Sequence, residues 1–188
     1  MTFTRSELES YRNATIDDIV GPDVRLVFVG INPGLWTAAT GAPFAHPGNR
    51  FYPAIHQAGI TPYRIDARQG LTDADVEMLL GRGIAMTNLV DRATARADEL
   101  TPAELREGAA ALVRKLASWE PEVVAMVGIT AYRRAFDEPK AVMGRQRTRP
   151  TAAEWWVLPN PSGLNAHETT ASLADWYRKA ARDATLDD

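Results

Sequence analysis

Four short, largely apolar runs limit the folds that this chain can adopt. They are continuous rather than alternating, and segments with helical spacing lie between them. Runs of this kind are typical of strands buried on both faces of a parallel sheet. Strands that alternate with helices predict an α/β protein, a three-layer α/β/α sandwich around a short, mainly parallel sheet. The expected strands are Val24–Val29, Ile84–Leu89, Val123–Val127 and Trp155–Leu158.

Five helices are expected around these strands. The clearest covers Pro102–Trp119, because Thr101 precedes it as an N-cap and Glu104 completes a capping box. A different pattern fills Leu35–Arg50, which is rich in Gly, Pro and small residues and is expected to be a long functional loop. The other expected helices are Asn49–Ala58, Asp73–Leu80, Thr130–Phe136 and Glu168–Ala184.

The length and composition indicate one domain of ordinary globular type. The 188 residues fit a single domain over 1–188, with a short polar N-terminal extension over about residues 1–15. The longest apolar runs have six or seven residues, too few to span a membrane. The polar start, Met1–Asp23, resembles neither a secretory signal nor a transit peptide. We therefore expect a cytoplasmic protein with no membrane partner.

Charge and cysteine content exclude several functional classes. The chain has no cysteine, so disulfides, thiolate nucleophiles and cysteine zinc sites are excluded. A net charge of −3 argues against a protein that coats nucleic acid by charge alone. A local basic stretch, Arg145–Arg149, is either a small binding face or a solvated loop.

Two short polar loops follow the first and last expected strands. They are Gly30–Gly34 and Asn160–Asn165, and each contains Asn, Pro and Gly, which end a strand and turn the backbone. In an open α/β sheet the ligand crevice lies at the carboxyl ends of the strands. The two loops therefore predict opposite walls of one site. The alternative is that both are ordinary strand-to-helix turns.

Asn32 is the residue of the first loop best suited to chemistry. Pro33 restricts the backbone of the residue before it, so the Asn32 side chain is aimed rather than free. A carboxamide offers an acceptor and two donors, which suits it to orient a water molecule or a carbonyl group, but it is a poor general base. The alternative is a turn asparagine that bonds its own backbone.

Four segments in this order resemble the mismatch-specific uracil/thymine DNA glycosylases, the MUG/TDG branch of the uracil-DNA glycosylase superfamily. The resemblance extends over roughly Ile16 to Arg182. The segments are Gly30–Leu35 (GINPGL), Pro43–Phe51 (PFAHPGNRF), Leu89–Thr94 (LVDRAT) and Leu158–Leu164 (LPNPSGL).

The resemblance implies a monofunctional DNA glycosylase with the uracil-DNA glycosylase fold. Such an enzyme flips uracil out of mispaired double-stranded DNA, hydrolyses its N-glycosidic bond and leaves an abasic site in base excision repair. Thymine and other damaged pyrimidines are further candidate substrates, and single-stranded DNA is a further candidate partner. The resemblance implies a monomer that needs neither a metal nor a cofactor.

The resemblance also assigns roles in the base pocket. Asn32 matches the catalytic asparagine that positions the attacking water. Ile31 and Gly34 match residues whose backbone lines the pocket. Phe44 matches the aromatic residue that stacks on the flipped base, with a core phenylalanine as its alternative. Thr37 matches a position that lies near the uracil in the family.

A carboxylate near Asn32 would assist water attack, because an amide is a weak base. Asp91 is the best candidate, since it follows the expected strand Ile84–Leu89 and lies at the same sheet edge. Its alternative is a salt bridge to Arg92 or a helix cap. His46 is another candidate because histidine titrates near neutral pH, with packing or loop hydrogen bonding as its alternative.

The second loop is expected to contact DNA. Asn160 and Ser162 offer hydrogen bonds to a base or a phosphate. By resemblance, Gly163, Leu164 and Asn165 form the wedge that enters the duplex, and Leu164 is the apolar insert. The alternative for Leu164 is a buried leucine under the turn.

The chain departs from the family pattern after Leu164. Asn165-Ala166-His167 stands where the family continues Ser-Arg, which removes an arginine that contacts the opposite guanine or a phosphate. U·A pairs and single strands therefore become candidate substrates. Asn88 falls where some relatives carry a lysine.

Two other functional classes compete with a glycosylase. One is a non-catalytic module that binds damaged DNA, because Asn32 is a poor base. The other is a nucleotide- or phosphate-binding α/β enzyme. No Gly-x-Gly-x-x-Gly follows the first strand and no Walker-type Gly-Lys-Ser/Thr is present, which argues against the second.

Overall fold

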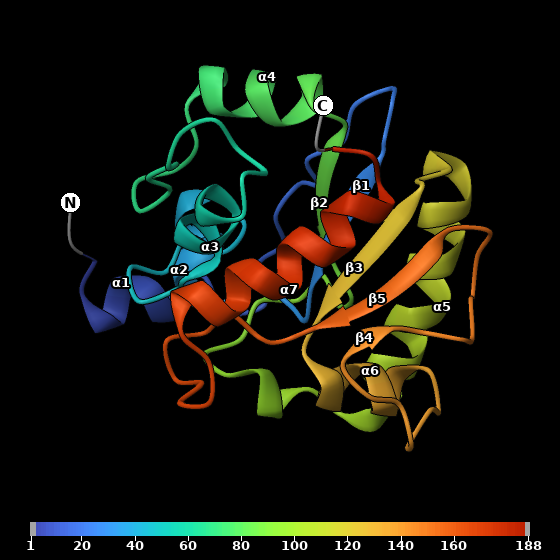
Figure 1. Cartoon of the computed structure of the whole chain (residues 1–188). Helices are drawn as coiled ribbons and strands as arrows, with labels where there is room; N and C mark the ends of the chain where they lie inside the picture. Colours follow the sequence, from blue (N-terminus) through green and yellow to red (C-terminus); the bar gives the residue numbers. More distant parts are fainter. Residues whose placement is uncertain (1–2, 187–188) are drawn as a thin grey trace.

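A five-stranded sheet forms the centre of the computed structural model, which describes residues 3–186 (Figure 1). The strand order is β2-β1-β3-β5-β4, and all neighbouring pairs are parallel except β4 with β5. The mainly parallel sheet expected from the apolar runs is therefore confirmed. The strands are β1 Leu26–Gly30, β2 Ile84–Asn88, β3 Val123–Val127, β4 Gly144–Arg145 and β5 Glu154–Leu158.

The register of the sheet brings the ends of four strands to one edge. β1 lies between β2 and β3 and is buried along its whole length. Gly30 at the end of β1 is opposite Asn88 at the end of β2. In the same way, Val127 of β3 is opposite Leu158 of β5. The loops that leave these strands consequently meet at the same side of the molecule.

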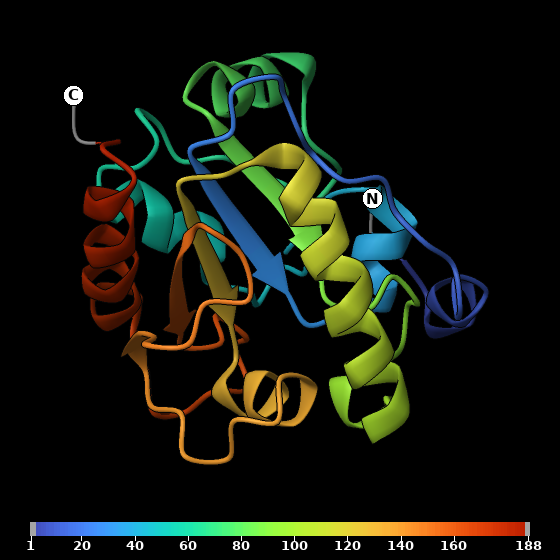
Figure 2. The ribbon, with the colours of Figure 1, turned by 90° about the vertical axis from the view of Figure 1, so that its right-hand side faces the viewer.

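Helices cover both faces of the sheet and complete the three expected layers (Figures 1 and 2). Side chains alternate along β1: Phe28 packs with the helices of one face, and Val27 and Val29 pack with those of the other. The first face carries α3 Phe51–Gln57, α4 Asp73–Gly81 and α7 Thr170–Asp183, and the second carries α5 Pro102–Trp119 and α6 Ile129–Ala135.

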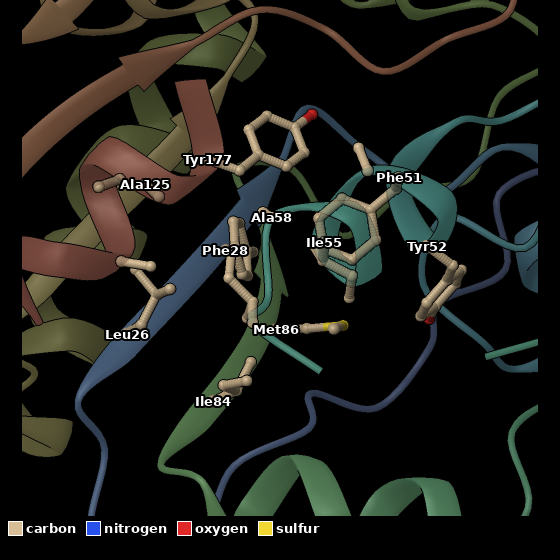
Figure 3. Close-up of a cluster of buried hydrophobic side chains, with 14 of the residues drawn as sticks. Leu26, Phe28, Phe51, Tyr52, Ile55, Ala58, Ile84, Met86, Ala125 and Tyr177 are labelled. Atoms are coloured by element: carbon tan, nitrogen blue, oxygen red, sulfur yellow. The ribbon is translucent and has the colours of Figure 1, made fainter. Parts of the chain in front are cut away.

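Aromatic side chains join β1 to the helices α3 and α7 (Figure 3). The Phe28 ring meets the Phe51 ring edge-on, with centroids 5.0 Å apart, and lies 5.8 Å from the Tyr177 ring. The buried Tyr177 hydroxyl donates a hydrogen bond to the Pro159 carbonyl at 3.2 Å, and burial raises its pKa well above the ordinary value. The core thus reaches the chain just before the second loop.

The segment expected to be one long loop contains a helix, α2 Leu35–Thr40. Leu35 and Thr37 of α2 are buried, so this helix has one side that faces the protein interior. The helix ends at Gly41, whose φ of 69° is the left-handed conformation that glycine adopts readily. The sequence did not predict α2, because a helix of six residues is too short to show a periodic apolar pattern.

Several other elements begin or end differently from the expectation. Helix α3 begins at Phe51 rather than at Asn49, whose Oδ1 accepts a hydrogen bond from the Phe51 N–H at 2.9 Å. The chain also contains three short elements that the apolar pattern did not predict. These are β4, α1 Arg5–Glu9 and the 3₁₀ helix η1 Ala97–Glu99.

The basic stretch near β4 is partly neutralised. Arg145 and Arg149 both form ion pairs with Glu154, at 2.7 Å and 2.6 Å. Arg147 is exposed.

No helix in residues 3–186 has the length and apolar character needed to cross a membrane.

The N-terminus of α5 has the expected capping box and one additional partner. The Thr101 Oγ1 accepts a hydrogen bond from the Glu104 N–H at 3.2 Å, and the Glu104 carboxylate accepts one from the Thr101 N–H at 2.8 Å. The same carboxylate accepts a hydrogen bond from Arg92 Nε at 2.8 Å. These bonds, above all the one from Arg92, lower the pKa of Glu104 from 4.5 to about 2.

We expect the Glu104→Gln variant to lose stability that depends on pH. Because the folded-state pKa of Glu104 is depressed, its contribution is present above pH 4.5 and is lost as the pH falls towards about 2. The melting temperature of the variant should be below that of the wild type at pH 7, and the difference should shrink between pH 4.5 and 2. A difference that stays constant over this range would contradict the assigned role of the carboxylate.

Candidate functional site

A cavity of about 610 Å³ opens at the sheet edge where the strands end. The end of β1, the end of β2 and the loop after β5 all contribute to its walls. Most of the residues expected at the site from the sequence line this cavity: Ile31, Asn32, Gly34, Thr37, Phe44, Asn160, Ser162 and Leu164. The two strand-end loops do form walls of one site.

Asn32 is held at the end of β1 by both of its amide hydrogens. Its Nδ2 donates to the Arg92 carbonyl and to Thr94 Oγ1, each at 2.8 Å. The Thr94 hydroxyl donates its own proton to the Arg96 carbonyl at 2.7 Å, so it is an acceptor toward Asn32. Both partners are therefore acceptors, which fixes the orientation of the carboxamide.

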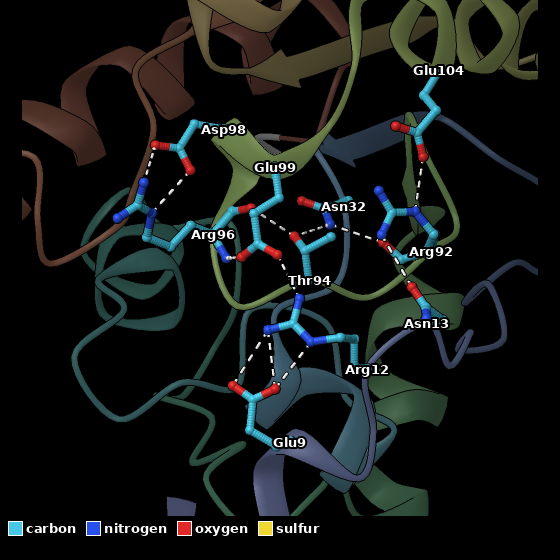
Figure 4. A network of polar contacts seen from close by, with 10 residues as sticks. All are labelled: Glu9, Arg12, Asn13, Asn32, Arg92, Thr94, Arg96, Asp98, Glu99 and Glu104. Atoms are coloured by element: carbon cyan, nitrogen blue, oxygen red, sulfur yellow. Dashed lines mark hydrogen bonds and ion pairs between the residues drawn. The ribbon is translucent and has the colours of Figure 1, made fainter.

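The oxygen of the Asn32 carboxamide is left as the group available to a ligand. The Asn32 carboxamide cannot rotate without losing the two hydrogen bonds that its NH₂ group donates. Breaking hydrogen bonds inside a protein is costly when the partners are left unpaired. Figure 4 shows the hydrogen bonds that hold Asn32, and they leave Oδ1 as a fixed acceptor. Asn32 lines the cavity. A fixed acceptor can orient a water molecule, but it cannot take a proton from it as a strong base would.

Thr94 is a site residue that sequence reasoning did not single out. It is 1% exposed and borders the cavity beside Asn32. The signal was present, because Thr94 ends the segment Leu89–Thr94 that contributes to the family resemblance. Its role depends on a contact between residues 62 positions apart, which no local pattern shows.

Phe44 combines a strained backbone with a stacked ring. Its φ is 57°, a left-handed conformation that a bulky residue rarely adopts and that costs about 1–3 kcal/mol. The ring stacks on Phe51 with centroids 4.0 Å apart and an interplanar angle of 19°, and it borders the cavity. Stacking on the core thus holds an aromatic surface at the cavity, where its role toward a base stays a prediction.

Asn88 lies beside Phe44 and Gly30 in the cavity wall. A side chain at position 30 would displace the Asn88 carboxamide, because a Cβ atom there would lie 2.6 Å from Asn88 Oδ1, while the Phe44 ring would be 3.5 Å away. The half-buried carboxamide of Asn88 therefore lies against the end of β1. A carboxamide next to an aromatic ring suits a flat heterocycle that has a neighbouring N–H and C=O at its edge.

Asp91 lies outside this arrangement. Its side chain is 64% exposed and is 3.8 Å from Lys115 Nζ on α5, and it does not line the cavity. The chain turns after β2 so that Asp91 projects toward α5, although its neighbour Arg92 holds Asn32 through its carbonyl. The structure therefore does not bring the expected carboxylate to the reacting side of Asn32.

The carboxylate that does border the cavity is Asp98. It forms a two-point ion pair with Arg96, with distances of 2.9 Å and 2.6 Å. This hydrogen bonding lowers the pKa of Asp98, so its carboxylate is charged and a weakened proton acceptor. Across residues 3–186, no group of three or more acidic or histidine side chains is arranged to hold a metal ion.

His46 borders the cavity and forms a hydrogen bond within its own loop. Its Nδ1 accepts from the Gly48 N–H at 3.0 Å, which places the proton of the neutral ring on Nε2. The ring also meets Trp36 edge-on, with centroids 6.0 Å apart. The loop-bonding interpretation of His46 matches these contacts.

Arg50 organises the second loop. Its guanidinium donates to the carbonyls of Ser162 and Asn165, each at 2.7 Å, and to the carbonyl of Glu168. Its backbone N–H donates to the Pro161 carbonyl at 3.0 Å. A rigid planar donor suits several carbonyls at once. The Arg50 side chain therefore holds the loop that carries Leu164 at three backbone carbonyls.

The tip of the second loop is exposed while its base is tightly packed. Leu164 is 92% exposed, which excludes a role as a buried core leucine. Next to it, Gly163 lies so close to the neighbouring chain that a Cβ atom would be 2.5 Å from the Gly48 carbonyl oxygen. The loop thus presents an exposed apolar side chain on a closely packed base.

Asn165 and Asn160 shape the loop from within. Asn165 Nδ2 donates to the Asn160 carbonyl at 3.0 Å, and its Oδ1 accepts from the His167 N–H at 3.1 Å. Asn160 Oδ1 accepts from the Ser162 N–H at 3.0 Å. The Asn165 side chain, expected to contact DNA, has both ends of its carboxamide engaged in this loop.

Comparison with known proteins assigns the chain to a family. Residues 18–185 match the family described as the Uracil DNA glycosylase superfamily. The fold is similar to the solution NMR structure of a "putative Uracil DNA glycosylase" from Methanosarcina acetivorans, with a TM-score of 0.58 and 14% sequence identity. The similarity covers 93% of this chain and 98% of that one.

We expect the Arg50→Lys variant to loosen the second loop. A lysine ammonium group lacks the planar set of donors with which the Arg50 guanidinium reaches three carbonyls. Losing a hydrogen bond from a charged group costs about 1.5 kcal/mol or more. Amide hydrogens of residues 160–168 should therefore exchange about tenfold faster, as followed by mass spectrometry. The exposed Arg147→Lys is the matched control, and equal exchange in both variants would refute the clamp.

Proposed function

Because this chain belongs to the uracil DNA glycosylase superfamily, we propose that it is a monofunctional DNA glycosylase that removes uracil from mispaired DNA and leaves an abasic site for base excision repair. The observation that carries this proposal is the fixed Asn32 carboxamide in a cavity that also holds Phe44 and Asn88. Thymine and other damaged pyrimidines are further candidate substrates.

The proposed reaction breaks the bond between the sugar C1′ and the base N1. The bonding electron pair leaves with the base, and a water oxygen adds to C1′. Asn32 Oδ1 accepts a hydrogen bond from this water and directs its lone pair at C1′. The water proton passes to solvent or to the departing base, since Asn32 itself cannot hold it.

Two further side chains support the base in this scheme. Phe44 offers a ring on which a flipped base stacks, and its other contact is the stacked ring of Phe51. Asn88 offers both a donor and an acceptor to the imide edge of uracil. Hydrogen bonds to the base become stronger as negative charge develops on it during bond breakage.

Leu164 is the proposed wedge. Extruding a nucleotide costs about a few kcal/mol, and fully burying a leucine side chain contributes about 1.5–3 kcal/mol. These two quantities are similar, so insertion of the exposed Leu164 offsets much of the extrusion cost. A mispaired base needs less energy to extrude than a Watson–Crick pair, which favours mispairs without direct contact to the opposite base.

The second loop supports a broader substrate range than G·U alone. The Asn165 carboxamide is engaged within the loop, and residues 165–167, directly after Leu164, include no arginine. Recognition of the opposite guanine by a side chain at these positions is therefore weak. We propose uracil removal from U·A pairs and single strands as secondary activities.

A non-catalytic module that binds damaged DNA is the competing proposal. Its support is that Asp91 does not line the cavity and pairs with Lys115 instead, so it does not serve Asn32 as a base. A uracil-containing oligonucleotide treated with the protein and then with alkali separates the two. Strand cleavage supports a glycosylase, and binding without cleavage supports the module.

We expect Asn32→Ala to lower uracil release by about a hundredfold, because an oriented group is lost from the reacting water. Release is measured by alkali cleavage of U·G, U·A, T·G and single-stranded oligonucleotides. The Arg92 carbonyl loses a partner, so the melting temperature must be measured alongside. Full activity in a folded Asn32→Ala variant would contradict the proposed role of Asn32 in uracil release.

We expect Leu164→Ala to reduce uracil release from duplex DNA much more than from single strands, because only a duplex has a stack to be filled. A loss of about 1.5–3 kcal/mol of burial corresponds to about ten- to a hundredfold in duplex activity. Val142→Ala, another exposed apolar residue, serves as the control. Equal losses on both substrates would remove the wedge role.

A further inference from the structure

The N-terminal residues 12–14 lie against the loop that holds Asn32, and they precede the region matched by the family, which begins at residue 18 (Figure 4). We call these residues the 12–14 segment and the loop the 92–94 loop. The contacts between them join the start of the chain to the candidate active site.

The first peptide group of the 92–94 loop is held from two sides. Its C=O belongs to Arg92 and accepts a hydrogen bond from Asn32 Nδ2 at 2.8 Å. Its N–H belongs to Ala93 and donates to the Ala14 carbonyl at 2.9 Å. Because a peptide group is planar and rigid, the position of Ala14 fixes the direction in which the Arg92 carbonyl points. Donation by the N–H also strengthens the same group as an acceptor.

The next peptide group of the loop is held in the same way. Its C=O belongs to Ala93 and accepts from the Asn13 N–H at 2.9 Å. Its N–H belongs to Thr94 and donates to the Pro33 carbonyl at 3.1 Å. Two consecutive peptide groups therefore lie between residues 13–14 on one side and residues 32–33 on the other.

Side chains add to this arrangement. Asn13 has a φ of 65°, and its Oδ1 accepts from Arg92 Nη1 at 3.1 Å. Arg92 also donates to Glu104 at 2.8 Å, so its side chain is held at two points. A further ion pair joins Arg12 to Glu99 at 2.5 Å. Exposed ion pairs contribute little, so Asn13 is the more informative position.

We propose that the 12–14 segment positions Asn32 through the 92–94 loop and so sets the rate of bond cleavage without contacting DNA or substrate. The proposal rests on the function proposed above. Asn13 is a positioning residue in this scheme, because it acts on the Asn32 carboxamide only through the Arg92 and Ala93 backbone.

Asn13→Gly and Asn13→Asp form a matched pair of variants. Gly and Asp both tolerate the left-handed backbone at this position, so neither variant strains it. Asn13→Gly loses the Oδ1 bond to Arg92 and gains backbone freedom, so the backbone hydrogen bonds between residues 13–14 and the 92–94 loop should weaken. Only Asp keeps an oxygen that accepts from Arg92. Arg5→Gln, at an exposed position of α1, controls for changes in the N-terminal charge.

The kinetic test measures uracil release at saturating enzyme and, separately, the Kd for DNA. Asn13→Gly should lower the rate about tenfold, because a small displacement of a positioned group costs up to about a hundredfold. The Kd should stay unchanged, and Asn13→Asp and Arg5→Gln should retain the wild-type rate. An unchanged rate in Asn13→Gly, or a loss confined to DNA affinity, would overturn the proposal.

A second measurement separates this inference from the proposed function. The side-chain amide signals of Asn32 in a ¹H–¹⁵N spectrum of the full chain are identified by their absence in Asn32→Ala. They should shift and broaden in Asn13→Gly and stay in place in Asn13→Asp and Arg5→Gln. If the wild type releases no uracil, the proposed function fails and this spectrum still decides the inference. Unchanged Asn32 signals in Asn13→Gly would refute it.

Discussion

The parallel pairing of β1 with β2 and β3 is the constraint on which the site depends. Parallel strands end in the same direction, so Gly30 and Asn88 meet at one edge. The chain can build a cavity there because both faces of β1 are covered, which leaves only the strand ends open. A single glycine, Gly30, then gives room for the Asn88 carboxamide and the Phe44 ring.

The electrostatics of the site are unusual for a hydrolase, because amides and backbone carbonyls surround the candidate reacting position. Asn32 faces the Arg92 carbonyl and Thr94, and the bordering carboxylate, Asp98, is paired with Arg96. Such a site can orient a water molecule but offers weak proton acceptance. It suits a reaction in which the leaving group departs before the water has fully attacked.

The sequence predicted the parts of this protein that depend on local patterns. The four parallel strands and helix α5 follow from apolar runs and a capping box, and the position of Asn32 follows from the strand end. The direction of Asp91 and the partners of Asn32 could not be predicted, because they depend on how the chain turns after β2. Helix α2 was missed because its inward side is only two residues long.

The contact between Gly163 and Gly48, together with the Arg50 clamp, affects how the cavity deforms. Residues 46–50 and 160–168 are bonded at several points, although more than a hundred positions separate them. These contacts therefore tie the wall beside Phe44 to the wall beside Leu164. A wider ligand would need both of these joined walls to shift together, so the same contacts that shape the cavity also resist its widening.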